Sequence, residues 1–295
     1  MSLTTADIQL RDPFVLPVEE ERTYYLFGST DADIWRGPGT GFDCYRSRDL
    51  ETWEGPYPAF RPAPDFWAET NFWAPEVHRY RGRYYLLATF KADGVRRGTQ
   101  VLVADAPTGP FTPHSAGPVT PRDWECLDGT LHVGPDGRPW MVFCHEWVQA
   151  GDGRVLAMPL TEDLSAAAGE PRELFRASQA PWAQQVHSER HGTGYVTDGP
   201  FLHRTAAGEL LMLWASFVGG RYAQGLARST TGDITGPWEH EPQPLYEGDG
   251  GHGMVFRRFD GDLVLTLHSP NRTPHERAQF IAVRENAGTL EVVAP

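Results

Sequence analysis

The segment GRYYLLAT, at residues 82–89, recurs along the chain in four variants, and this repeat decides the fold. A turn and a short apolar stretch precede each copy, a third strand-like stretch follows it, and there is room for a fourth strand. Repeated units of this size, each a small antiparallel sheet, are typical of a β-propeller. The other copies are RTYYLFGS at 22–29, GRPWMVFC at 137–144, GELLMLWA at 208–215 and GDLVLTLH at 261–268.

Five copies predict an all-β chain that folds as a five-bladed β-propeller, with residues 1–295 forming a single catalytic domain. The composition agrees, since 31 Gly, 25 Pro and 15 Phe among 295 residues favour turns and short strands over long helices. A large β-sandwich with fortuitous spacing is the alternative.

Polar residues recur near the start of the first strand of the units. These starts are R-D-P-F-V, W-A-P-E-V, L-D-G-T-L, T-D-G-P-F and G-H-G-M-V. The first strand of each propeller blade lines the central channel, so we expect equivalent positions to meet at one mouth of that channel. Carboxylates brought together there repel one another and oppose folding, so a purely structural role is unfavourable. Such a cluster therefore indicates an acid–base site or a metal-binding ring. The second positions are Asp12, Ala74, Asp128, Asp198 and His252.

Three carboxylates on separate blades suit glycoside hydrolysis. One protonates the departing glycosidic oxygen, and another deprotonates a water on the opposite face of the sugar. A third keeps the acid protonated by like-charge coupling. We therefore expect Asp12, Asp128 and Asp198 to be catalytic.

The chain resembles glycoside hydrolase family 43 through RDPFVL, FWAPEVHRYRGRYYL, LDGTLHVGPDGRPWMVF, TDGPFLHR, GGHGMVF and LTLHSPN, which span residues 11–271. The resemblance implies a five-bladed propeller and an inverting mechanism that requires no cofactor. It implies that Asp12 is the general base and that Asp128 tunes the acid and orients the substrate. Asp198 stands where the family usually has a Glu as general acid. His252 matches a histidine that often helps to bind a structural calcium ion, mostly through waters.

Asp198 departs from the family pattern because Asp is one methylene shorter than Glu. Its carboxyl is set back by roughly 1.5 Å, which a small strand movement or a water relay would absorb. Otherwise another acid donates the proton, and Glu125 and Glu189 are the reserve candidates.

Aromatic residues near the expected channel mouth are candidates for sugar binding, because aromatic faces bind the apolar C–H surfaces of sugar rings. Phe72 and Trp73 precede the channel strand of the second unit, and Trp35 lies on a loop between Gly and Pro residues. Packing between blades is the alternative for Trp73.

Two charged groups are further candidates for substrate binding. Glu76 lies on the same strand face as Ala74, where it is expected to bind a sugar hydroxyl or to pair with an inter-blade arginine. The family resemblance also implies an arginine from the fifth blade against the substrate. Arg277 is preferred to Arg272 because it leads directly into a strand.

The charge of the chain limits its partners. A formal net charge of −13 disfavours nucleic acid and anionic membranes, and it is compatible with a neutral oligosaccharide or polysaccharide.

The start MSLTTADIQLRDPF lacks the basic and apolar regions of a signal peptide, which predicts a cytoplasmic protein. A secreted chain that had lost its leader would show the same pattern, and the oligomeric state is open.

The expected function is an inverting, exo-acting glycoside hydrolase. The resemblance implies release of a terminal sugar such as L-arabinofuranose or D-xylose from plant-type oligosaccharides. The alternatives are a non-catalytic carbohydrate-binding propeller and a related retaining, fructosidase-like enzyme. The usual Asn-Asp-Pro-Asn nucleophile motif of the fructosidase-like group is absent from this sequence.

Overall fold

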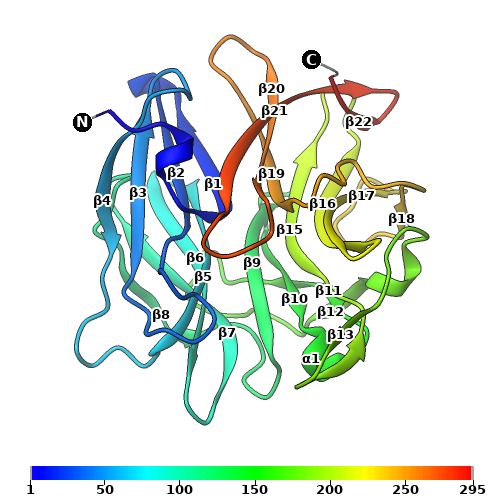
Figure 1. Cartoon of the computed structure of the whole chain (residues 1–295), viewed down its shortest axis with the longest axis horizontal. Helices are drawn as coiled ribbons and strands as arrows, with labels where there is room; N and C mark the ends of the chain where they lie inside the picture. The colour runs from blue at the N-terminus through cyan, green and yellow to red at the C-terminus, as the bar shows by residue number, and fades with distance from the viewer. Residues whose placement is uncertain (1, 294–295) are drawn as a thin grey trace.

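Five four-stranded antiparallel sheets surround a common axis in the computed structural model, which describes residues 2–293 (Figure 1). Each sheet is one blade, and its strands follow chain order from the channel to the rim. The strand-like stretches recognised in the sequence form the three inner strands of every blade, and a fourth strand completes each blade. The prediction of an all-β, five-bladed β-propeller is confirmed.

The blades are numbered here in chain order. Blade 1 contains β1 (Arg11–Val18), β2 (Thr23–Ser29), β3 (Phe42–Ser47) and β4 (Glu54–Phe60). Blade 2 contains β5 (Thr70–Tyr80), β6 (Arg83–Ala92), β7 (Val95–Ala104) and β8 (Thr112–Pro118). Blade 3 contains β9 (Cys126–Val133), β10 (Pro139–His145), β11 (Arg154–Pro159) and β12 (Arg172–Arg176). Blade 4 contains β15 (Asp198–Arg204), β16 (Leu210–Val218), β17 (Arg221–Ser229) and β18 (Trp238–His240). Blade 5 contains β19 (Gly251–Arg257), β20 (Leu263–Ser269), β21 (Arg277–Asn286) and β22 (Thr289–Val292).

Short elements join the blades. One further hairpin, β13 (Val186–Ser188) with β14 (Gly192–Gly194), lies between blades 3 and 4. The helical turns are η1 (Thr5–Asp7), η2 (Glu19–Glu21), α1 (Trp147–Ala150) and η3 (Ala177–Gln179). No helix within residues 2–293 is long and apolar enough to cross a membrane.

The innermost strand of every blade is irregular at its entrance to the channel. The register between the first and second strands shifts there in all five blades. Each irregular stretch contains a residue with a left-handed backbone, which bends the strand. The equivalent residues of the five blades are Asp12 (φ 54°), Ala74 (φ 47°), Asp128 (φ 58°), Gly199 (φ 52°) and His252 (φ 51°), and blade 2 has a second one in Asn71 (φ 52°).

Blade 4 corrects the alignment made from the sequence. Asp198 pairs with Ala215, as Arg11 pairs with Ser29 in blade 1, so Asp198 lies one residue before the left-handed position. Gly199 occupies that position instead. Glycine adopts a left-handed backbone with no steric cost to a Cβ, which favours this register. The equivalence of Asp198 with Asp12 was therefore wrong by one residue.

The core lies between the blades, where aromatic side chains pack in groups. Between blades 1 and 2, Phe72 is 1 % exposed, and its ring lies 4.9 Å from that of Phe90. A Cβ placed on Gly39 would overlap the Phe72 ring, which shows how closely the chain covers it. Phe72 therefore cannot reach a substrate, and its assignment to sugar binding was wrong.

The N-terminal segment is tied to blade 5. Arg277 donates from Nε to the carbonyl of Ala6 (2.8 Å) and from Nη1 to the carbonyls of Pro274 (3.1 Å) and Glu276 (2.7 Å). Its guanidinium is thus used in joining the chain start to β21. The contact of Arg277 with a substrate stays a prediction.

Candidate active site

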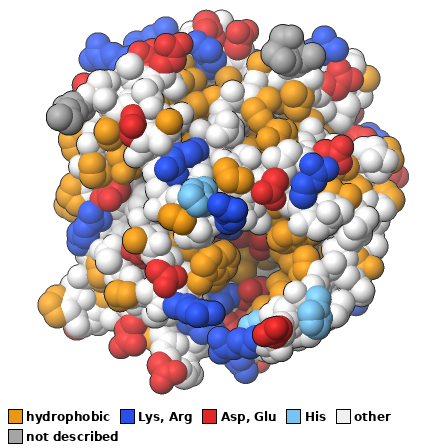
Figure 2. Space-filling model, in the orientation of Figure 1, with side chains coloured by type: hydrophobic (Ala, Val, Ile, Leu, Met, Phe, Trp, Pro, Cys, Tyr) orange, Lys and Arg blue, Asp and Glu red, His pale blue; other side chains and the backbone are white. Residues whose placement is uncertain are grey.

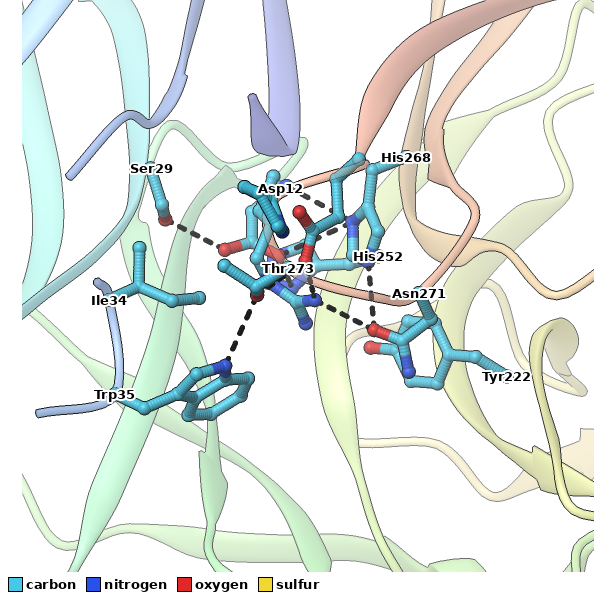
Figure 3. A network of polar contacts seen from close by, with 12 residues as sticks. Asp12, Ser29, Ile34, Trp35, Tyr222, His252, His268, Asn271 and Thr273 are labelled. Atoms are coloured by element: carbon cyan, nitrogen blue, oxygen red, sulfur yellow. Dashed lines mark hydrogen bonds and ion pairs between the residues drawn. The ribbon is translucent and has the colours of Figure 1, made fainter. Parts of the chain in front are cut away.

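Asp12 lies among polar groups from blades 1 and 5 (Figure 3). The Nδ1 atom of His252 is 3.2 Å from Asp12 Oδ1, and the Ser29 hydroxyl donates to Oδ2 at 2.8 Å. The Asp12 backbone N–H donates to Nδ1 of His268 at 3.1 Å. Ser29 Oγ also accepts a hydrogen bond from the backbone N–H of Ala74 (2.9 Å), which links the innermost strand of blade 2 to this carboxylate.

These contacts fix the protonation of the groups around Asp12. Burial alone would raise the pKa of Asp12, but the charge and hydrogen bond of His252, together with Arg11, hold it well below its usual range. Burial disfavours a charged His252, yet Asp12 and Asp128 outweigh it and raise the pKa of His252 to about 10. Burial and the nearby Arg11 lower the pKa of His268 to about 3, so its Nδ1 is free to accept the Asp12 N–H.

Asp128 and Asp198 face the same channel mouth from blades 3 and 4. The Gly199 N–H donates to Asp128 Oδ2 (3.0 Å), and the Tyr222 hydroxyl donates to Asp198 Oδ2 (2.9 Å). Burial raises the pKa of both carboxyls, and the negative charge of Asp12 raises them further, against the opposing charge of His252. The mouth therefore holds one carboxylate that stays ionised and two that retain protons to higher pH.

Two tryptophans stand beside these carboxyls. The Trp35 and Trp73 rings meet edge to face with centroids 5.3 Å apart. The Trp73 indole N–H donates to the carbonyl of Ile34 (2.6 Å), and that of Trp35 donates to Thr273 Oγ1 (3.2 Å). Trp35 remains 52 % exposed although both ends of its loop are held, so part of its ring surface is available to a ligand. The face drawn in Figure 2 is hollowed below its centre, with acidic side chains inside and hydrophobic and basic side chains around it.

Two arginines hold this aromatic pair, Arg11 buried and Arg97 half-buried, and neither was predicted as a site residue. The Arg11 guanidinium lies 5.1 Å from the Trp35 ring, and that of Arg97 lies 4.5 Å from the Trp73 ring. Arg11 Nη1 donates to Asn271 Oδ1 (2.8 Å) and to Glu276 Oε1 (2.9 Å). The signal for Arg11 was its place beside Asp12 in the RDPFVL motif.

Arg97 and its neighbours account for one of the reserve acids. Arg97 pairs with Glu146 and donates to Asn71 Oδ1 at 3.3 Å. Glu125 accepts from Lys91 (2.9 Å) and from the Arg97 N–H (3.0 Å). Burial raises the pKa of Glu125, but these contacts outweigh it and lower the pKa, which makes Glu125 a poor proton donor.

The remaining expected residues have other surroundings. Glu76 is buried and its Oε2 lies 2.9 Å from Nε2 of His78, two residues further along β5. The expected inter-blade arginine partner of Glu76 was therefore wrong, since its polar partner is His78. Glu189 is exposed at the turn between β13 and β14.

Calcium at His252 was tested against the residues around it. Residues 2–293 contain no group of three or more His, Cys, Asp or Glu side chains arranged to hold a metal ion. Nδ1 of His252 faces the Asp12 carboxylate, and the raised pKa makes this nitrogen a hydrogen-bond donor rather than a metal ligand. These residues do not by themselves form a calcium site, so no catalytic step is derived through an ion, and binding through waters stays a prediction.

Known proteins are similar to this chain in sequence and in fold. Residues 5–284 match the sequence model of Glycosyl hydrolases family 43. An endo-arabinase from Bacteroides thetaiotaomicron has 41 % sequence identity and a TM-score of 0.91, over 97 % of this chain and 98 % of that chain. The extracellular exo-α-(1→5)-L-arabinofuranosidase ArbA of Cellvibrio japonicus is 23 % identical over 296 residues, which cover 89 % of this chain and 79 % of that protein. A β-D-galactofuranosidase of Aspergillus niger is 24 % identical over 264 residues, which cover 83 % of this chain and 70 % of that protein. The chain therefore belongs to glycosyl hydrolase family 43 and is a glycosidase built on a five-bladed propeller.

Proposed function

We propose that this glycosidase inverts the anomeric centre and releases terminal α-L-arabinofuranose from arabinan-type oligosaccharides. The observation that carries the proposal is the contrast in surroundings at the channel mouth. The His252 ring lies 3.2 Å from Asp12 and lowers the pKa of that carboxyl, whereas burial raises the pKa of Asp198. This contrast is what a base and an acid on opposite sides of a glycosidic bond require. L-Arabinofuranose is favoured over D-xylose because the relative with 41 % identity is described as an endo-arabinase.

Each carboxyl has one role in the proposed reaction. Asp12 takes a proton from a water whose oxygen attacks the anomeric carbon. The bond from that carbon to the glycosidic oxygen breaks, and Asp198 gives its proton to the departing oxygen. Asp128 orients the substrate in this proposal, and its own position is fixed by the Gly199 N–H. Burial and the charge of Asp12 keep the pKa of Asp198 raised. Solvent then takes the proton from Asp12 and reprotonates Asp198.

His252 and Ser29 prepare Asp12 for this role. The imidazolium of His252 keeps the carboxylate ionised, and the Ser29 hydroxyl fixes the orientation of its second oxygen. A base oriented in this way loses little entropy when the water binds, which lowers the barrier.

Trp35 is proposed as the platform for the sugar ring. Its loop is held to Thr273 of blade 5 on one side, and Trp73 of blade 2 is held to Ile34 of the same loop. We infer that this bridged loop restricts one side of the mouth, which would favour the end of a sugar chain over a polymer that continues past the site.

Endo action is the second candidate, because the endo-arabinase relative matches nearly the whole length of the chain. Linear α-1,5-arabino-oligosaccharides reduced at one end distinguish the two modes. Exo action releases only arabinose in early samples, whereas internal cleavage releases oligosaccharides first.

The proposed activity is tested with aryl glycosides of α-L-arabinofuranose and β-D-xylose. We expect hydrolysis of the arabinofuranoside, and NMR of the first product should show the inverted anomer. Asp12→Ala should abolish turnover, whereas Asp198→Ala should lose far more activity on poor leaving groups than on good ones. Full activity of Asp12→Ala, or a first product with the retained anomer, would contradict the proposal. The cytoplasmic location is a separate prediction, which fractionation of the producing cells checks.

A further inference from the structure

Among residues 2–293, the hydroxyl of Tyr222 makes one hydrogen bond to a side chain, to Oδ2 of Asp198 at 2.9 Å. We propose that Tyr222 is a positioning residue for the proton donor: by donating to Oδ2, it leaves the acidic proton of Asp198 on Oδ1, the oxygen that would then donate to the substrate. This inference rests on the proposed role of Asp198 as general acid.

The Tyr222 ring is held on several sides, so its hydroxyl has a fixed position. The ring stacks on His268 with centroids 5.5 Å apart and planes 23° apart, and it lies 5.1 Å from the Phe217 ring. A Cβ placed on Gly251 would come within 2.7 Å of the Tyr222 ring, so the ring lies directly against the backbone of β19. The Tyr222 carbonyl also accepts the N–H of Gly250 at 3.1 Å. Blades 4 and 5 together therefore place this donor.

The chemistry of a carboxylic acid determines what this contact does. One oxygen of a protonated carboxyl donates and the other accepts, and an oxygen that already accepts a hydrogen bond is the less favourable place for the proton. Burial and the neighbouring Asp198 and Asp12 raise the pKa of Tyr222 well above its usual value, so the hydroxyl keeps the proton that it donates to Oδ2. Oδ2 of Asp198 is thus the accepting oxygen, and Oδ1 carries the proton.

The same contact becomes stronger as the reaction proceeds. The proton leaves Oδ1 for the departing glycosidic oxygen, the electron pair of the broken O–H bond stays on Asp198, and the carboxyl becomes a carboxylate. A hydrogen bond to an ionised acceptor is roughly twice as strong as one to a neutral acceptor. The Tyr222 hydroxyl therefore stabilises the transition state more than the ground state, which lowers the barrier.

The short side chain of Asp198 makes this support necessary. Asp has one rotatable bond fewer than Glu, so its carboxyl has fewer ways to reach the glycosidic oxygen when its position changes. In blade 4 the left-handed turn falls on Gly199, which fixes where the Asp198 side chain starts. Tyr222 then fixes where that side chain ends.

The test compares Tyr222→Phe with a matched control, Tyr80→Phe. Tyr80 is also buried, but its hydroxyl has no hydrogen-bond partner among residues 2–293, so its loss removes no contact. kcat is measured on aryl α-L-arabinofuranosides whose phenols span a range of acidity. Tyr222→Phe should lower kcat about tenfold or more on poor leaving groups and little on a dinitrophenol, while Tyr80→Phe should match the wild type. The basic limb of the pH profile should also move to higher pH in Tyr222→Phe, because the ionised form of Asp198 loses a donor.

A double-mutant comparison separates positioning from a merely structural role. If Tyr222 acts through Asp198, adding Tyr222→Phe to Asp198→Ala should cause no further loss of kcat. An equal loss on all leaving groups, or an additive loss in the double variant, would overturn the inference. Wild-type protein inactive on the whole panel would instead contradict the proposed function, so the two failures are distinguishable.

Asp198→Glu gives a second test that does not depend on folding of the tyrosine variant. The added methylene moves the carboxyl by roughly 1.5 Å and breaks its contact with the fixed Tyr222 hydroxyl. We therefore expect Asp198→Glu to show the same steep dependence on leaving group as Tyr222→Phe, although it restores the residue that the family usually has. Wild-type kcat on poor leaving groups in Asp198→Glu would overturn the inference.

Discussion

Gly199→Ala probes the position at which blade 4 departs from the other blades. Gly199 has φ 52°, and a Cβ added there would lie 2.5 Å from Cδ2 of His252 and 3.0 Å from its Cα. The backbone conformation alone is tolerable, since Ala74 adopts it at the equivalent position of blade 2. The main cost of the substitution is therefore the overlap with His252. Because the His252 backbone itself is in the way, a rotamer change cannot relieve this overlap.

The expected loss of stability has two parts. A left-handed alanine costs about 1 to 2 kcal/mol relative to glycine. Extra atoms forced into a packed site cost about 1 to 3 kcal/mol more. Since one kcal/mol shifts the melting temperature of a chain of this size by about 2 °C, Gly199→Ala should lower Tm by roughly 4 to 10 °C. Movement of the Gly199 N–H away from Asp128 Oδ2 should also lower kcat at least about tenfold.

Gly208→Ala is the matched control for this prediction. Gly208 is also in blade 4 and has φ +91°, but a Cβ there would meet nothing within 4 Å. It should show only the backbone cost and keep wild-type kcat. Thermal unfolding followed by circular dichroism, together with kcat on an aryl arabinofuranoside, measures both effects. If Gly199→Ala matched Gly208→Ala in Tm and in kcat, the placement of the Gly199 bend against His252 would be refuted.

Three further predictions follow from the same surroundings. Asp12 acts as a base above its lowered pKa, so kcat/KM should stay high to more acidic pH than an aspartate with the ordinary pKa would allow. Asp198 acts as an acid below its raised pKa, so kcat/KM should fall only above the pH range in which ordinary carboxyls titrate. A pH–rate profile with both limbs near pH 4 would contradict this. Trp35→Ala removes the exposed platform and should raise KM about tenfold with little change in kcat, and an unchanged KM in steady-state kinetics would exclude Trp35 from substrate binding. Burial lowers the pKa of His240 to about 4, and both its ring nitrogens lack partners among residues 2–293. Its neutral ring therefore costs no stability above about pH 6.5. As pH falls from there toward 4, the unfolded chain takes up a proton that the folded chain does not, and the free energy of unfolding decreases. His240→Phe should therefore reduce the loss of unfolding free energy between pH 7 and pH 4 by up to about 3 kcal/mol, as measured by denaturant titration, and equal losses in both proteins would disprove the assignment.

Much of the fold could be predicted because the information is local and repeated. Each blade is a run of consecutive strands joined by short turns, so the apolar segments and the turns between them identify the strands directly. The recurrence of one pattern five times then restricts the arrangement to a ring. The channel-facing Asp12 and Asp128 followed from the same repeat, since the first strand of each blade occupies an equivalent place.

The site needed more than this repeat, as its individual residues show. A one-residue change in register moves a side chain to the other face of the strand. In blade 4 the left-handed position falls on Gly199 rather than Asp198, because a Cβ at that position would overlap His252 of the next blade. Phe72 and Trp73 are neighbours in sequence, yet the pleat sends Phe72 into the core and leaves Trp73 at the mouth.

The five-bladed propeller, the family and two channel carboxylates could be predicted from the amino-acid sequence, because they depend on local patterns that repeat along the chain. The groups that control those carboxyls became visible in the folded chain alone. Ser29 meets Asp12 from the next strand, while Tyr222 meets Asp198 from 24 residues away. His252 reaches Asp12 from the opposite end of the chain, where blade 5 closes the ring onto blade 1. Such contacts depend on the closed geometry of the ring and on the register of each strand, and separations of this kind leave no local pattern in a single sequence.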